Sequence, residues 1–175
     1  ELNVTYFSTE FRDMIAFVFR EGPDFLNVQK ARSRGVEFGG RLYFSHGISA
    51  RGSYTFLQTQ VLDSGGVGGA AFVDGNSLIR RPEHVGSLTV NYTYNDLNTN
   101  FHTFFKGRVR DLDYSKGFSS RRVRLQGYVR SDLALSYVLF RDRWNIRSLT
   151  LEGQAKNIFD QNYEEVYGFS SAGAT

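Results

Sequence analysis

The chain has 175 residues, of which 41% are hydrophobic, and it contains no cysteine. The apolar residues are scattered: no run approaches the ~18–20 apolar residues that a transmembrane helix requires, and without cysteine neither disulfides nor thiolate metal sites arise. The formal net charge is +3, but basic and acidic residues are mixed along the sequence, which argues against nucleic acid as a partner.

The composition favours β-structure. The sequence contains 16 Phe, 10 Tyr and 18 Gly but only 2 Pro, an aromatic and glycine-rich profile that is typical of strands and turns. Its hydrophilic average does not exclude a membrane protein, because the strands of outer-membrane barrels alternate polar and apolar residues. The N-terminal residues show no signal-peptide pattern and resemble the middle of a strand, so we expect further sequence upstream.

The first predicted strand changes phase along its length. Its apolar residues occupy even positions at Leu2, Val4 and Tyr6, and odd positions from Phe11 onward. Because neighbouring residues of a strand point to opposite faces, one extra residue would explain such a slip. The sequence therefore predicts a β-bulge between Phe7 and Phe11, with a turn as the alternative.

Clean alternation of apolar and polar residues predicts the strands that follow. In one of them Leu88 and Val90 face one way, while Thr89 and Asn91 face the other. The 3.6-residue period of a helix is not found. The segments with this alternation are, in chain order, Val36–Phe44, Ile48–Phe56, Val85–Tyr94, Asn100–Arg110, Ser131–Leu139 and Leu149–Asp160.

Short and long connections alternate between these strands. Turn residues predict tight turns at Ser45–Gly47, Asn95–Asn98 and Arg141–Asn145. The connections Leu62–Glu83 and Asp111–Gln126 are long and rich in Gly, Ser and charged residues. Short turns on one side and long loops on the other are typical of outer-membrane barrels.

The strand lengths fit a membrane. The strands reach about 12–16 residues, compared with about 5–6 in globular proteins. Fourteen residues at ~3.3 Å each, tilted by ~45°, rise about 33 Å, slightly more than the hydrocarbon core of a bilayer. We therefore expect an all-β, antiparallel up-and-down meander of about seven strands, part of a large transmembrane β-barrel. A soluble β-sandwich or lipocalin-like barrel is the alternative, which strand height and loop asymmetry disfavour.

Four segments, in this order, resemble TonB-dependent outer-membrane receptors. The first two are "YFSTEFRDMIAF" and "ARSRGVEFGGRLYF", with a Gly-Val-Glu core at Gly35–Glu37. The third, "RRPEHVGSLTVNY", is similar to the family's Arg-Pro-x-His segment. The fourth, "AKNIFDQNYEEVYGF", is similar to its Asn-[Leu/Ile]-Phe-Asp-x-x-Tyr signature, at Asn157–Asp160 and Tyr163. Together the four segments extend the resemblance over nearly the whole chain.

The resemblance implies a barrel of roughly 22 strands with a plugged lumen. It also implies import of a scarce nutrient with energy from an inner-membrane TonB complex, which contacts a segment N-terminal to the barrel. The terminal motif looks most like the vitamin B12 (cobalamin) receptors, with ferric siderophore receptors close behind. We expect the chain to be the C-terminal part of such a barrel, without plug domain or last strand, in the bacterial outer membrane among lipid and lipopolysaccharide.

The sequence contains no pattern that indicates catalysis, so we expect neither an enzyme nor a cofactor. His46, His84 and His102 belong to different elements and predict no metal site. No nucleophile elbow occurs. The "GGVGGA" segment lacks the Gly-Lys-Ser/Thr and the helix of a phosphate-binding loop, so a flexible loop is the simpler interpretation.

The long loops contain the candidate ligand-binding residues. Arg121, Arg122 and Arg124 could bind anionic ligand groups or lipopolysaccharide phosphates through their guanidinium forks; an ordinary solvated loop is the alternative. Oxygen ligands could bind Ca²⁺ in the other loop, although no ligand spacing is recognisable. Its candidate residues are Asp63, Asp74 and Asn76.

Two classes of function remain open. One is a plugged transport receptor, and the other is a passive or adhesive outer-membrane barrel without a plug. A plug domain of ~100–150 residues upstream would distinguish them. Residues predicted to face the lumen would hydrate it or pair with the plug; they are Glu37, Arg41, Arg51, Glu152 and Lys156.

Overall fold

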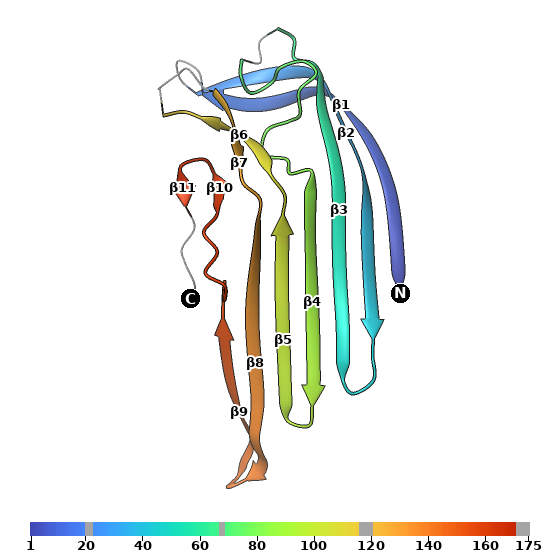
Figure 1. Cartoon of the computed structure of the whole chain (residues 1–175), viewed down its shortest axis with the longest axis vertical. Helices are drawn as coiled ribbons and strands as arrows, with labels where there is room; N and C mark the ends of the chain where they lie inside the picture. Colours follow the sequence, from blue (N-terminus) through green and yellow to red (C-terminus); the bar gives the residue numbers. More distant parts are fainter. Residues whose placement is uncertain (20–22, 67–68, 116–120, 171–175) are drawn as a thin grey trace.

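The computed structural model describes residues 1–19, 23–66, 69–115 and 121–170. Within these residues every regular element is a strand, and the cartoon in Figure 1 contains no helix. The predicted all-β class is confirmed. No helix in this part of the chain is long and apolar enough to cross a bilayer.

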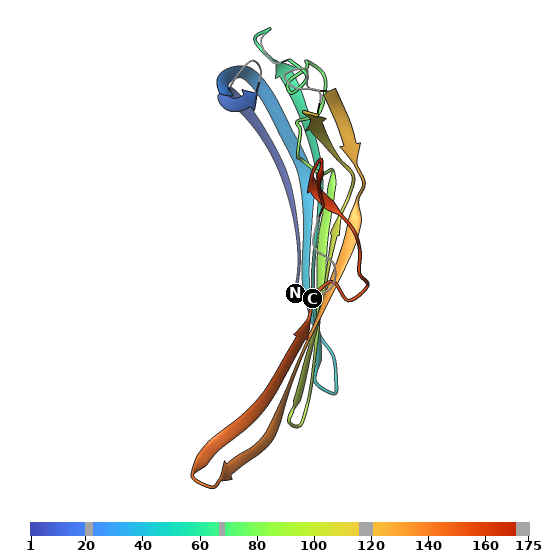
Figure 2. The same cartoon turned by 90° about the vertical axis from the view of Figure 1, so that its left-hand side faces the viewer.

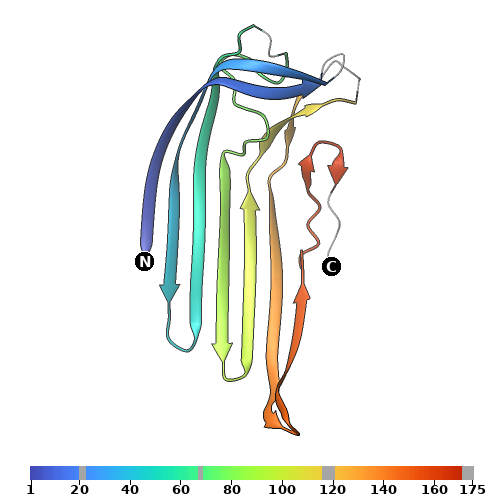
Figure 3. The ribbon, with the colours of Figure 1, turned by 180° about the vertical axis from the view of Figure 1, so that it is seen from behind.

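Seven strands form one antiparallel sheet in the order β1-β2-β3-β4-β5-β8-β9 (Figures 1 and 3). The predicted meander of about seven strands is therefore confirmed. Among the described residues, β1 and β9 are its two edges. The strands are β1 (Leu2–Phe19), β2 (Pro23–Tyr43), β3 (Ile48–Asp63), β4 (His84–Tyr94), β5 (Leu97–Lys106), β8 (Tyr128–Arg143) and β9 (Ile146–Ala155).

Two small hairpins complete the fold. In chain order, β6 (Val109–Asp113) and β7 (Arg121–Leu125) lie between β5 and β8 and pair with each other. After β9, β10 (Glu164–Val166) pairs with β11 (Phe169–Ser170). The prediction placed a continuous strand as far as Arg110 and a loop from Asp111 to Gln126, and this was wrong. The main ladder leaves β5 at Lys106, and the chain resumes as a separate hairpin.

All three tight turns lie at the same end of the sheet, which we call the turn end; the opposite end is the loop end (Figure 1). The turn at Ser45–Gly47 has positive φ at His46 (63°) and Gly47 (75°). The other two lie within the predicted ranges but are shorter, because the strands continue to within two residues of each other. The β8–β9 turn has φ of 54° and 60° at its two central residues, Trp144 and Asn145, as the hairpin turns of twisted strands require.

The seven-stranded sheet is curved along its height (Figure 2). It has one largely apolar and one largely polar face. Residues that pair across strands share a face, so the register aligns their side chains in rows. One row on the apolar face consists of Val4, Phe38, Tyr54, Gly86, Phe105 and Val129. One row on the polar face consists of Arg41, Arg51, Thr89, His102 and Asp132.

The apolar face has the height of a membrane band. On β8 it extends from Val129 to Leu139. These ten residue steps cover about 33 Å along the strand. A tilt of ~40° reduces the rise to about 25 Å, the height of the lipid-facing band of outer-membrane barrels.

A small hydrophobic cluster, the loop-end core, lies where the long loops meet β2, β3 and β6. Its members come from four separate segments, so the chain after Ala70 packs against the sheet instead of extending into solvent. Met14, Ala70 and Ile79 pack on its margin. The buried members are Val28, Ala31, Val61, Ala71, Phe72, Leu78 and Leu112.

The β-bulge predicted between Phe7 and Phe11 is absent from the described β1–β2 ladder. Its pairs run without a shift from Leu2–Gly40 to Arg12–Lys30. The irregularity lies instead at Asp13, whose φ is 55°, and the same register resumes beyond it.

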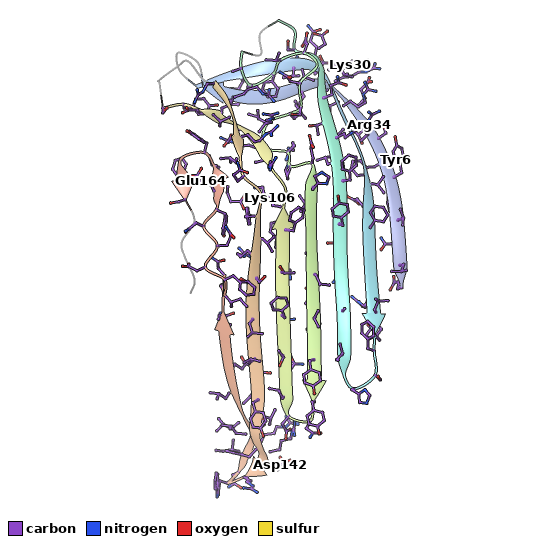
Figure 4. All side chains as sticks on the ribbon, in the orientation of Figure 1. Tyr6, Lys30, Arg34, Lys106, Asp142 and Glu164 are labelled. Atoms are coloured by element: carbon purple, nitrogen blue, oxygen red, sulfur yellow. The ribbon has the colours of Figure 1, made fainter. Side chains whose placement is uncertain are left out.

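The apolar pattern changes phase for another reason. Phe11 pairs with Ala31, and Ala31 pairs with Val61 in the loop-end core. The other side of β2 carries the charged residues Lys30 and Arg34, which lie toward the loop end (Figure 4). The buried positions of β2 thus include Ala31 on one side and Val28 on the other. The β1–β2 ladder passes this region without an inserted residue, whereas the β2–β3 ladder shifts register between Lys30 and Ala31, where Leu62 is the extra residue of β3.

Candidate ligand site at the loop end

Hydrogen bonds fold the described parts of the connection between β3 and β4 (residues 64–66 and 69–83) onto the sheet. The Asp74 carboxylate accepts the Ser64 N–H at 2.7 Å, and the Asp63 carboxylate accepts the Gly65 N–H at 2.8 Å. Asn76 accepts the Val61 N–H at 2.8 Å through its backbone carbonyl. Among the described residues, no three His, Asp or Glu side chains gather as a metal site. The two aspartates therefore act on the shape of the loop.

The three candidate arginines have different surroundings. The Arg122 guanidinium donates to the carbonyls of Ser77 (2.6 Å), Ala71 (3.2 Å) and Ala70 (3.4 Å). Burial lowers the pKa of Arg122, and the nearby Arg110 lowers it further. Because three backbone carbonyls from one loop surround it, Arg122 joins the β6–β7 hairpin to residues 70–77.

Arg121 and Arg124 are exposed. The Arg121 guanidinium lies 3.5 Å from the Asp113 carboxylate on the facing strand of the hairpin. Arg124 pairs in the ladder with Arg110 and points to a pocket described below. The structure thus separates three residues that are neighbours in the sequence.

Asp111 is a loop-end residue that sequence reasoning missed. Its carboxylate is fully buried and accepts the Arg80 Nε–H at 2.7 Å and the Tyr167 N–H at 2.8 Å. It therefore joins the β3–β4 connection, β6 and the C-terminal hairpin. Nothing in the alternation around Asp111 indicates burial, because its partners lie 31 and 56 residues away.

The segment that follows β9 turns back onto β8 at Asn157, where φ is 52°. The Asn157 N–H donates to the Asp132 carboxylate at 2.8 Å, and the Ile158 N–H donates to the Ser131 carbonyl at 2.8 Å. The Asn157 side chain also bonds Gln161 in both directions. β9 therefore ends at Ala155, five residues before the predicted Asp160.

Beyond this corner the chain packs on the start of β8. Tyr163 stacks on Tyr128 with ring centroids 4.1 Å apart. Glu165 accepts hydrogen bonds from Lys106 and from the Tyr128 hydroxyl, and Figure 4 shows Lys106 at the loop end of β5 beside the segment that carries Glu164. Partial burial acts to raise the pKa of Glu165, but the bonds from Lys106 and Tyr128 outweigh it and lower the net pKa.

A pocket of about 690 Å³ lies at the loop end of β4, β5 and β8. Its lining includes Phe105 and Val129 from the apolar face and Tyr128 from the polar face. Two glycines, Gly107 and Gly127, lie where the ladder stops. A Cβ on Gly127 would lie 2.6 Å from the Lys106 carbonyl oxygen, so the backbones are in close contact there. The charged lining consists of Arg81, Arg108, Arg110, Arg124 and Glu83.

The family model described as "TonB dependent receptor-like, beta-barrel" matches residues 1–158. The chain belongs to this family. TonB-dependent receptor barrels are proteins of the bacterial outer membrane, and this localisation applies to the chain. The soluble β-barrel alternative is thereby excluded.

Solved structures agree on the fold. The siderophore receptor PiuA from Acinetobacter baumannii is 19% identical, with a TM-score of 0.71, and the match covers 99% of this chain and 25% of PiuA. The ferric yersiniabactin uptake receptor FyuA from Yersinia pestis is 18% identical, with a TM-score of 0.69, and the match covers 99% of this chain and 24% of FyuA. The copper transporter OprC is 15% identical, with a TM-score of 0.73, and the match covers 99% of this chain and 26% of OprC. The chain thus spans about a quarter of the receptors that it matches.

Three receptor-like segments of the sequence have evident structural roles in this barrel. Gly35 is buried, and a Cβ there would collide with the Phe56 carbonyl and the Phe7 ring. The Arg-Pro-x-His segment ends at His84, whose Nδ1 lies 2.7 Å from the Tyr54 hydroxyl. The Asn157 corner directs the last loop onto β8. These three segments, which carry the resemblance to TonB-dependent receptors, therefore stabilise the fold of this chain.

Proposed function

We propose that the intact protein is an outer-membrane receptor that imports a scarce nutrient, a ferric siderophore or cobalamin, with energy supplied through TonB. The observation that carries the proposal is the family match over residues 1–158. The apolar face, about 25 Å high, supports a membrane position among lipid and lipopolysaccharide. The TonB contact is proposed to lie N-terminal to the barrel.

The two nutrient classes rest on different support. The siderophore class is supported by the names of similar structures, since PiuA and FyuA are siderophore receptors. The cobalamin class is supported by the terminal Asn157–Asp160 signature and its loop. An outer-membrane barrel without a plug, passive or adhesive, is the competing proposal, and it requires no energy.

Ligand recognition is proposed for the loop end, because recognition residues are commonly placed on loops above a rigid scaffold. Asn76, Arg121 and Arg124 have exposed side chains for direct contact. Asp63, Asp74 and Arg122 bond the loop backbone. For these three residues we propose an indirect role, in which they hold the loop in its binding conformation.

Uptake by cells tests the proposal. A strain lacking the full-length gene is supplied with radiolabelled ferric siderophores or radiolabelled cobalamin, with and without a protonophore. We expect the gene to restore uptake of one nutrient class and the protonophore to abolish it. Uptake that persists with the protonophore would favour the passive barrel. If neither nutrient is taken up, the transport proposal is wrong.

A pair of matched variants tests the role of the loop end. Arg121→Ala with Arg124→Ala removes two exposed cations near the proposed ligand. Arg143→Ala with Arg147→Ala removes two cations at the turn end. We expect the first pair alone to reduce uptake of an anionic ligand; equal uptake by both would give the loop arginines no role in recognition.

A further inference from the structure

We propose that the pocket at the loop end of β4, β5 and β8 binds an anion with two or more phosphate or carboxylate groups. Its volume, about 690 Å³, lies within the range of about 300–1,000 Å³ usual for small-ligand sites. The inference concerns the charge of the pocket and stands whether or not the uptake proposal is right.

The charge of the lining is the first argument. The pocket is lined by four arginines, Arg81, Arg108, Arg110 and Arg124, and by a single carboxylate residue, Glu83. Within the described residues none of the four forms an ion pair or a side-chain hydrogen bond. The other loop-end arginines differ, since Arg80 and Arg121 pair with aspartates and Arg122 binds carbonyls.

The ladder position of two arginines is the second argument. Arg110 and Arg124 are direct partners across the β6–β7 hairpin, and like charges opposite each other destabilise a pair of strands. Arg110 also lowers the pKa of Arg122. An anion between the two guanidinium groups would remove this repulsion. The arrangement is therefore unfavourable when empty and favourable when an anion is bound.

Geometry narrows the class of ligand. Guanidinium groups match phosphate and carboxylate oxygens with two parallel hydrogen bonds, so four arginines suit a ligand with several such groups. The close backbone contact at Gly107 and Gly127 holds β5 and β8 together beneath the pocket. Phe105 and Val129 connect the pocket to the apolar face. A membrane glycolipid phosphate and a soluble chelate with several carboxylates both have this chemistry.

Calorimetry on the full-length receptor in detergent tests the inference, with inorganic pyrophosphate as the probe. The pocket variant is Arg110→Gln with Arg124→Gln, and the control is Arg143→Gln with Arg147→Gln, which removes the same charge at the turn end. We expect the Kd to rise at least about tenfold in the pocket variant only. An unchanged Kd, or an equal rise in the control, would overturn the proposal.

Thermal unfolding is a second, independent test of anion binding in the pocket. Because the Gln variant removes repulsion, its Tm without anion should equal or exceed that of the parent, and added pyrophosphate should raise the Tm of the parent alone. A lower Tm in the Gln variant without anion would contradict the repulsion argument. If the Gln variant does not fold, Arg110→Lys with Arg124→Lys keeps the charge but loses the fork, and its Kd should still rise.

Two further arms identify the source of the anion. If it is a membrane glycolipid, the purified pocket variant should retain less lipopolysaccharide than the control. If it is a soluble chelate, retained lipopolysaccharide should be equal and binding of iron(III) citrate should weaken. If lipopolysaccharide retention and citrate binding are both unchanged, the pocket has no physiological anion of either kind and the proposal fails.

Discussion

The Asp111 carboxylate is buried 2.7 Å from the Arg80 Nε, and this pair joins the β3–β4 connection to the β6–β7 hairpin. Asp111→Ala leaves the Arg80 guanidinium and the Tyr167 N–H without their acceptor, a loss of about 1–3 kcal/mol. We expect the loss to be local, so hydrogen exchange should accelerate in residues 77–83 and 164–170. Arg121→Ala removes an exposed guanidinium 3.5 Å from the Asp113 carboxylate, which also accepts the Ser115 N–H, and should change exchange little. Equal exchange in both variants would deny Asp111 this role.

The two faces of β8 should differ in what they tolerate. Leu135 lies on the apolar face, and Ser136 lies on the polar face opposite Glu152. In the intact barrel Leu135→Arg should cost about 2–4 kcal/mol, because it places a cation at the lipid midplane. Ser136→Arg should be nearly neutral. Refolding titrations into lipid vesicles measure both, and equal costs would mean that the faces are assigned wrongly.

Gly35 should tolerate no side chain. An added Cβ collides with the Phe56 carbonyl and the Phe7 ring, whereas a Cβ on Gly153 meets nothing within 4 Å. Gly35→Ala therefore forces β2 and β3 apart, and overpacking of this kind costs about 1–3 kcal/mol. Gly153→Ala is the matched control. The fraction of folded barrel on unheated gels measures both, and the prediction fails if Gly35→Ala folds as well as the control.

Acid should release the C-terminal hairpin from β8. The pKa of Glu165 is lowered from its ordinary value of 4.5 in the folded protein. A lowered carboxyl pKa gives stability that is complete above the unfolded-state pKa and is lost as the pH falls through the folded-state pKa. Hydrogen exchange of residues 164–170 should therefore accelerate only at pH values below 4.5.

Glu165→Gln should abolish this pH dependence, because the amide does not ionise. Glu152→Gln, a change on the polar face of β9, should leave it intact. Exchange that accelerates in acid equally in all three proteins would show that another group controls the hairpin.

Alternation was sufficient to predict the main sheet, because over most of the sheet one face of the strands is largely apolar; exceptions include Thr99 and Thr103 of β5. It was misleading near Phe11, since the same change of phase arises where β1 and β2 reach the loop-end core without an inserted residue in their ladder. The β6–β7 hairpin was missed because Val109 continues the odd-numbered apolar set of Phe101 and Phe105, although the ladder has already ended at Lys106.

The candidate ligand site was less predictable from the sequence than the main sheet. Arg121, Arg122 and Arg124 are close in the sequence, but alternation along β7 puts only Arg121 on the other face. Arg122 and Arg124 share a face and differ because Arg122 lies against residues 70–77, whereas Arg124 lines the pocket. Arg81, Arg108 and Arg110 reach the same pocket as Arg124 only through the long-range packing of three segments. No local sequence pattern predicts that these arginines line one pocket, and none predicts that Asp111 is buried and joins three segments.

The loop-end core limits what an antibody against the folded chain can contact in residues 69–83. Ala71, Phe72 and Leu78 are buried against the sheet, and three backbone carbonyls of the same segment are occupied by Arg122. A synthetic peptide copying residues 69–83 would instead expose these apolar side chains. Antibodies raised against the peptide would recognise groups that the folded receptor hides. We therefore expect that antibodies to the folded form of this region require an immunogen that retains β2, β3 and the β6–β7 hairpin.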